Sequence, residues 1–126
     1  MQGRVKVLGM EDDPGVAGSL KKELEAEGYH TVLACRGDDG LRAATESAFD
    51  VVVTDLKMPG LTGLELVSQL HAARPKLPII LMTAFGTPEV VRGALDLGAY
   101  RVVGKPLEMH ELSDMVTAAG TARLTH

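Results

Sequence analysis

One stretch of this sequence limits the possible folds more than any other: residues 51–55 read Val-Val-Val-Thr-Asp. All but the last residue are β-branched, and apolar and polar positions do not alternate. Such a run is typical of a strand buried on both faces, as in a parallel sheet covered by helices on each side. A strand of this kind exposes a functional group only at its end, and open α/β sheets bind ligands at that carboxyl end. Asp55 is therefore placed to take part in chemistry.

Composition and charge narrow the class of protein. The chain has 126 residues, enough for one domain with a core on both faces of a sheet. Its net charge of −4 gives no reason to expect nucleic acid or an anionic membrane as a partner. No apolar stretch approaches the roughly 20 residues of a membrane span. Cys35 is the single cysteine, so an internal disulfide is excluded, and we expect a cytoplasmic domain.

Strand and helix patterns alternate along the chain. We expect strands at residues 4–8, 30–35, 51–55, 77–82 and 100–103. Apolar positions with helical spacing lie between them, and typical helix starts occur at Asp13, at Thr62 with Glu65, and at Thr87. Strict alternation predicts an α/β fold: a doubly wound five-stranded parallel sheet with helices on both faces.

Polar residues follow the predicted strands. Glu11 and Asp12 come after the first strand, and Asp55 ends the third. Thr83 and Lys105 come after the fourth and fifth strands. Because parallel strands end at the same edge of a sheet, we expect these five side chains to converge there. Neighbouring carboxylates repel one another unless a cation lies between them, and carboxylate oxygens suit Mg²⁺. The set predicts a Mg²⁺-dependent phosphoryl transfer with Asp55 as nucleophile.

Five tracts, taken in order, resemble the receiver domains of bacterial two-component response regulators. They are residues 11–14, 54–60, 82–86, 97–100 and 105–106. The chain is most similar to receivers of the nitrogen-regulatory type, which precede an ATPase of the sigma-54 activator class. The resemblance covers residues 1–120, and we expect residues 121–126 to be a C-terminal tail or the start of a linker. It implies a flavodoxin-like sheet with strand order 2-1-3-4-5.

The resemblance assigns phosphorylation to Asp55, with a histidine kinase as the partner that supplies the phosphoryl group. It implies that Mg²⁺ is the cofactor and is bound by Glu11, Asp12, Asp55 and the backbone carbonyl of Lys57. The domain would then be a regulatory phosphoacceptor that catalyses only its own phosphoryl transfer and slow dephosphorylation, and we do not class it as an enzyme.

The remaining roles concern the phosphate and the switch. The resemblance implies that Thr83, Ala84 and Lys105 bind the phosphate, and that the peptide bond before Pro106 is cis. It places the output surface on the fourth helix, fifth strand and fifth helix, where a homodimer could form. An output domain in the same full-length chain is compatible with it. This domain itself is expected to bind neither nucleic acid nor a membrane.

Two departures from the family pattern keep an alternative open. Glu11 stands where Asp is usual, so its longer side chain would reach the metal differently or through water. Val102 stands where an aromatic usually turns inward as Thr83 moves toward the phosphate, and valine has less volume and one dominant χ1 state. Thr83 and Val102 are therefore the predicted switch residues. The alternative is a pseudo-receiver, an interaction module that acts without phosphorylation.

Two enzyme-like interpretations are disfavoured. Mg²⁺-dependent phosphatases with an aspartyl-phosphate intermediate need an acid two residues after the nucleophile, where this chain has Lys57. Residues 98–106 superficially resemble a nucleotide-binding P-loop, but the spacing is one residue too long. Pro106 also stands where that motif needs a metal-binding hydroxyl.

Overall fold

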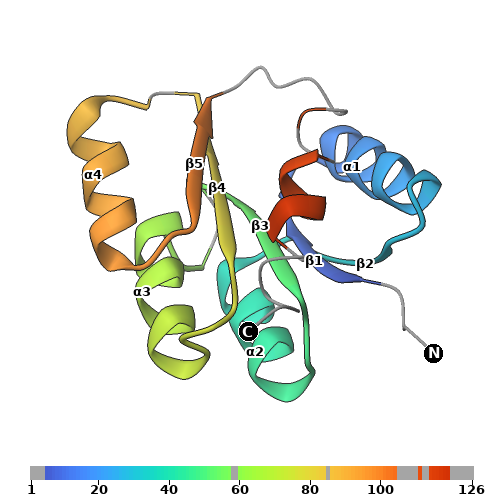
Figure 1. The fold of residues 1–126 in the computed structure, drawn as a ribbon, viewed down its shortest axis with the longest axis horizontal. Coiled ribbons are helices and arrows are strands. Elements are labelled where there is room, and N and C mark those ends of the chain that lie inside the picture. The colour runs from blue at the N-terminus through green and yellow to red at the C-terminus, as the bar shows by residue number, and fades with distance from the viewer. Residues whose placement is uncertain (1–4, 58–59, 85, 105–110, 112–113, 120–126) are drawn as a thin grey trace.

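The computed structural model describes residues 5–57, 60–84, 86–104, 111 and 114–119 (Figure 1). A five-stranded sheet with strand order β2-β1-β3-β4-β5 forms its centre, and every neighbouring pair is parallel. The strands are β1 Lys6–Met10, β2 His30–Ala34, β3 Val51–Asp55, β4 Ile79–Thr83 and β5 Arg101–Gly104. The predicted doubly wound, flavodoxin-like α/β fold is confirmed.

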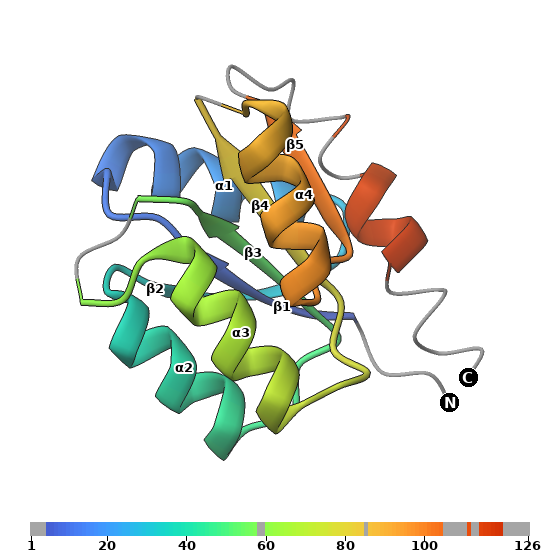
Figure 2. The same ribbon diagram turned by 90° about the vertical axis from the view of Figure 1, so that its left-hand side faces the viewer.

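Helices cover both faces of the sheet. They are α1 Pro14–Ala26, α2 Gly37–Glu46, α3 Gly63–Ala73 and α4 Pro88–Leu97, and residues 114–119 are also helical. Figures 1 and 2 show α1 and residues 114–119 on one face, and α2, α3 and α4 on the other. Each face has its own apolar core, one around Leu20, Val53 and Val116 and the other around Leu66 and Leu81. Because both faces of the central strands are buried, functional groups are left to the edges of the sheet.

Capping residues fix where three helices begin. Asp13 caps α1 and accepts a hydrogen bond from the backbone N–H of Gly15 at 2.9 Å. Thr62 and Glu65 form a reciprocal capping box at the start of α3, and Thr87 caps α4. These caps were expected from the sequence, and they give Asp13 a structural role beside the acidic cluster.

The first strand begins and ends later than the sequence indicates. β1 is Lys6–Met10 rather than residues 4–8, so Met10 is fully buried and Glu11 follows the strand directly. Gly9 obscured this extension, since glycine is unfavourable in a strand. Here it suits the packing, because a Cβ at position 9 would lie 3.1 Å from side-chain carbons of both Leu20 and Leu33, and both side chains would have to shift.

The last strand is also shifted. β5 is Arg101–Gly104 rather than residues 100–103, so Tyr100 precedes the strand and is 42% exposed. Its backbone N–H donates to the carbonyl of Ile79 at 2.8 Å, which leads the chain into the sheet. Val102 is partly buried opposite Leu81 and packs against the core on the face of α2, α3 and α4.

Candidate functional site

The strand register brings the ends of β1, β3 and β4, where site residues were predicted, to one edge of the sheet. Met10, the residue before Glu11, pairs with Thr54, the residue before Asp55. Asp55 in turn pairs with Met82, the residue before Thr83. The residues that end or follow β1, β3 and β4 are therefore neighbours at the carboxyl edge, as the topology predicted.

Three carboxylates meet at this edge. One oxygen each from Glu11, Asp12 and Asp55 lies within 4.8 Å of the others. Oxygens on opposite sides of an octahedral Mg²⁺ are about 4.2 Å apart, since each ligand distance is about 2.1 Å. A single ion could therefore take all three oxygens after small side-chain movements. An all-oxygen, anionic donor set is also what Mg²⁺ prefers.

The three acids differ in how the fold holds them. Glu11 is only 3% exposed, whereas Asp55 is partly buried and Asp12 is exposed. The backbone N–H of Glu11 donates to the carbonyl of Ala34, and its Oε2 accepts from the backbone N–H of Asp13 at 3.2 Å. The longer glutamate side chain thus bonds its own loop while it also contributes to the cluster.

Some of the other predicted site residues lie in described parts of the chain, and some do not. Thr83 ends β4 and is 2% exposed, while Lys57 and Ala84 are exposed in the loops that follow Asp55 and Thr83. Lys105 and Pro106 lie outside the described residues, so the lysine's contacts and the cis peptide bond stay predictions. The structure brings Glu11, Asp12 and Asp55 together as a cluster. Metal binding by these acids, phosphorylation of Asp55 and phosphate binding by Thr83 and Ala84 stay predictions.

The sequence matches the response regulator receiver domain over residues 7–117. The chain belongs to this family. Phosphorylation-based signalling in two-component systems is the family's general function. Among the described residues, no helix is both long and apolar enough to cross a membrane.

The relatives of this chain include transcriptional regulators. The chain is 40% identical over 114 residues to the uncharacterized transcriptional regulatory protein YkoG of Bacillus subtilis, covering 90% of this chain and 50% of YkoG. It is 32% identical over 119 residues to the transcriptional regulatory protein ZraR of Salmonella typhimurium, covering 94% of this chain and 27% of ZraR. The chain thus spans half the length of one regulator and about a quarter of the other.

One relative has almost the same length as the chain. Sporulation initiation phosphotransferase F of Bacillus subtilis is 31% identical over 111 residues, which cover 88% of this chain and 90% of that protein. Its name shows that phosphoryl transfer occurs among the relatives.

Solved structures agree with the fold. A receiver domain protein from Methanospirillum hungatei superposes with a TM-score of 0.93 at 26% identity, covering 98% of both chains. The beryllofluoride-activated NtrC4 receiver domain dimer gives 0.88 at 26% identity, covering 94% of this chain and 98% of that one. The predicted resemblance to receivers of the nitrogen-regulatory, sigma-54 activator type is confirmed by relatives such as ZraR and NtrC4.

Proposed function

We propose that this chain is a phosphorylation-dependent receiver whose Asp55 accepts a phosphoryl group from a histidine kinase. The observation that carries the proposal is the meeting of three carboxylates at the carboxyl edge of the sheet, with oxygens within 4.8 Å of one another. Like charges this close are unfavourable without a cation. Thr83 ends the neighbouring strand, where a hydroxyl can reach a phosphoryl group on Asp55.

The proposed chemistry needs few protein groups. A carboxylate oxygen of Asp55 forms a bond to phosphorus while the phosphorus–nitrogen bond of phosphohistidine breaks and its electron pair stays on the imidazole. Glu11, Asp12, Asp55 and the Lys57 carbonyl would hold Mg²⁺, which would supply charge neutralisation at the phosphoryl oxygens. Thr83, the backbone N–H of Ala84 and Lys105 would donate to those oxygens.

The proposed output surface comprises α4, β5 and the helix that includes residues 114–119. Apolar side chains are exposed on the first part of this surface: Leu95 is 46% exposed, Leu97 38% and Tyr100 42%. Exposed apolar side chains at these positions are compatible with a protein partner, and the NtrC4 receiver was solved as a dimer. We therefore propose a homodimer through this surface. We also propose an output domain in the full-length chain, since regulators such as YkoG are about twice as long as the match.

Phosphoryl transfer from acetyl phosphate tests the proposal. Wild type is expected to gain the mass of one phosphoryl group when Mg²⁺ is present and not when EDTA replaces it. Asp55→Ala should gain nothing, while the control Asp39→Ala, which removes an acid from the first turn of α2, should be labelled like wild type. Equal labelling of Asp55→Ala, or no Mg²⁺-dependent labelling of wild type, would contradict the proposal.

The pseudo-receiver is the second candidate, and Val102 is the observation that favours it. Val102 is partly buried against the core and pairs with Leu81. A valine at this position has less volume than an aromatic and one dominant χ1 state, so it offers little that could be redistributed on phosphorylation. Beryllofluoride, which mimics the phosphoryl group, separates the two candidates. A change in oligomeric state or in amide exchange near Val102 supports a switch, whereas no change at saturation supports a module that acts without one.

A further inference from the structure

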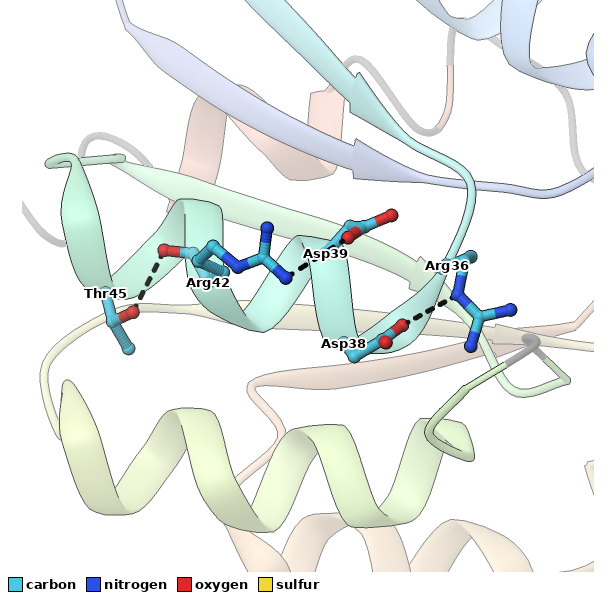
Figure 3. Close-up of polar contacts among 5 residues, drawn as sticks. All are labelled: Arg36, Asp38, Asp39, Arg42 and Thr45. Carbon is cyan, nitrogen blue, oxygen red and sulfur yellow. Dashed lines mark hydrogen bonds and ion pairs between the residues drawn. The ribbon is translucent and has the colours of Figure 1, made fainter.

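An ion pair stands at the beginning of α2. Nε of Arg36 donates to Oδ1 of Asp38 at 3.0 Å, and both side chains are about half exposed (Figure 3). The hydrogen bond from Arg36 lowers the pKa of Asp38 below its ordinary value, so the pair is charged at neutral pH. An acid in the first turn is also favoured by the helix dipole.

This pair lies against the loop that follows Asp55. A Cβ built on Gly60 would collide with Oδ1 of Asp38 and would lie 3.2 Å from Nη2 of Arg36. Gly60 has φ of 91°, a conformation that favours glycine. Glycine at position 60 therefore allows both the turn and the close approach of the ion pair to the loop backbone.

A second contact joins the same helix turn to the next loop residue. A Cβ built on Gly37 would lie 2.7 Å from the carbonyl oxygen of Leu61 and 2.9 Å from its nitrogen. The backbones of α2 and the loop thus touch with no side chain between them. Two successive loop residues, Gly60 and Leu61, are held by the first turn of α2.

The ends of the loop are anchored by backbone bonds. The N–H of Leu56 donates to the carbonyl of Met82 at 2.8 Å, and the N–H of Gly63 donates to the carbonyl of Leu56 at 2.7 Å. These bonds fix where the loop leaves β3 and enters α3. The contacts from α2 add a restraint between these two ends, at Gly60 and Leu61. Gly60 comes three residues after Lys57, and the Lys57 carbonyl is a proposed Mg²⁺ ligand.

We propose that the Arg36–Asp38 pair is a positioning element: it holds the loop after Asp55 and so strengthens Mg²⁺ binding through the Lys57 carbonyl. The proposal rests on the proposed metal site. Groups that orient metal ligands commonly affect affinity without touching the ion.

The same helix supplies a matched control. Asp39 is also in the first turn and also pairs with an arginine, since its Oδ1 lies 3.7 Å from Nη2 of Arg42. Figure 3 shows this second pair further along α2. Asp38→Ala and Asp39→Ala therefore remove the same charge, a similar dipole interaction and one ion pair each. They differ in the contact with Gly60 and in one hydrogen bond, because Asp38 accepts from Arg36 at 3.0 Å whereas the 3.7 Å between Asp39 and Arg42 is too long for one.

Calorimetric titration with Mg²⁺ measures the effect. Asp38→Ala is expected to bind Mg²⁺ about tenfold more weakly than wild type, the lower end for groups that orient metal ligands. Asp39→Ala is expected to stay within about twofold, as for an exposed ion pair. Asp38→Asn keeps an acceptor oxygen beside Gly60 and should lie closer to wild type than Asp38→Ala, although both variants lose the charge. Amide exchange at Gly60 and Leu61 should quicken in Asp38→Ala alone.

The outcomes separate this inference from the proposed function. If wild type binds no Mg²⁺, the proposed metal site fails. If wild type binds Mg²⁺ but Asp38→Ala and Asp39→Ala have equal affinities, only the positioning role is overturned. Equal affinities of Asp38→Asn and Asp38→Ala would also overturn it. Should Asp38→Ala fail to fold, Arg36→Gln compared with Arg42→Gln gives the same test.

Discussion

Charged groups gather at both edges of the sheet, around Asp55 at the carboxyl edge and around Lys6 at the amino edge. At the amino edge, Lys6 and Asp50 each meet a complementary group. The backbone N–H of Lys6 donates to Oδ2 of Asp50 at 2.9 Å, and the Lys6 ammonium lies 4.6 Å from the ring centroid of Phe49. At the carboxyl edge three groups of the same charge are brought together.

Arg74 shows how the amino edge uses charge. It ends α3 and donates from Nε to the carbonyl of Ala44 at 3.2 Å and from Nη2 to the carbonyl of Thr45 at 3.0 Å. These carbonyls belong to the last turn of α2, where acceptors lack partners within the helix and the dipole favours a cation. The amino edge is thus arranged for stability. At the carboxyl edge, the repulsion among three clustered carboxylates lowers stability. Such a local cost is expected where a ligand binds.

The largest expected effect is the change in the free energy of unfolding when Mg²⁺ is added, which should depend on the carboxyl edge and not on the amino edge. At about 100 times its dissociation constant, Mg²⁺ should stabilise wild type by about 2.7 kcal/mol. Asp12→Asn should lose most of that gain, yet be more stable than wild type in EDTA. Two like charges about 4 Å apart repel by about 1 kcal/mol in water, and the substitution removes that repulsion. Urea unfolding with Mg²⁺ and with EDTA measures both changes.

Asp50→Asn is the control from the amino edge. It weakens the bond from the Lys6 N–H, so it should lower the free energy of unfolding equally with Mg²⁺ and with EDTA. A full Mg²⁺ gain in Asp12→Asn would contradict the assignment of the carboxyl edge as the metal site.

The next effect concerns the amino edge alone. Arg74→Ala should lower the free energy of unfolding by about 1–2 kcal/mol, because two carbonyls of α2 lose a charged donor. Arg42→Ala removes an arginine from the exposed pair with Asp39 and should cost about 0.5 kcal/mol or less. Thermal unfolding of the two variants compares them, and neither should alter phosphorylation of Asp55. Equal losses of stability would show that the Arg74 bonds add nothing beyond an ordinary surface arginine.

Most of the carboxyl edge could be predicted from the sequence, because its features are local or follow from topology. The run at residues 51–55 reveals a buried strand, and parallel strands must end together. The meeting of Glu11, Asp12 and Asp55 follows from these two facts. The bounds of β1 were less accessible, since Gly9 is unfavourable in a strand and its use depends on Leu20 and Leu33.

The contacts that join distant segments were not predictable in the same way. Arg74 reaches carbonyls about 30 positions earlier, and nothing in its neighbourhood differs from a solvated surface arginine. The contact of Asp38 with Gly60 depends on a glycine that brings no side chain, so it leaves no periodic pattern. Gly60 could be recognised as a turn residue, but not as the place where α2 touches the loop.

The smallest expected effect is a pH dependence of stability that arises from Glu65. This residue lies at the carboxyl edge, but its carboxylate accepts a hydrogen bond from a backbone N–H, as Asp50 does at the amino edge. The backbone N–H of Thr62 donates to Oε1 of Glu65 at 3.0 Å, and this bond, with a smaller contribution from the Thr62 side chain, lowers the pKa of Glu65 below its usual 4.5. A lowered pKa in the folded state stabilises the protein where the carboxylate is charged. That stabilisation is lost as the pH falls from 4.5 through the lowered value. Wild type should therefore unfold at a slightly higher temperature than Glu65→Gln at about pH 7, and the difference should shrink as the pH falls below 4.5. A difference that stays constant over this range would show that the charge of Glu65 does not contribute, and that the capping box acts through its neutral hydrogen bonds.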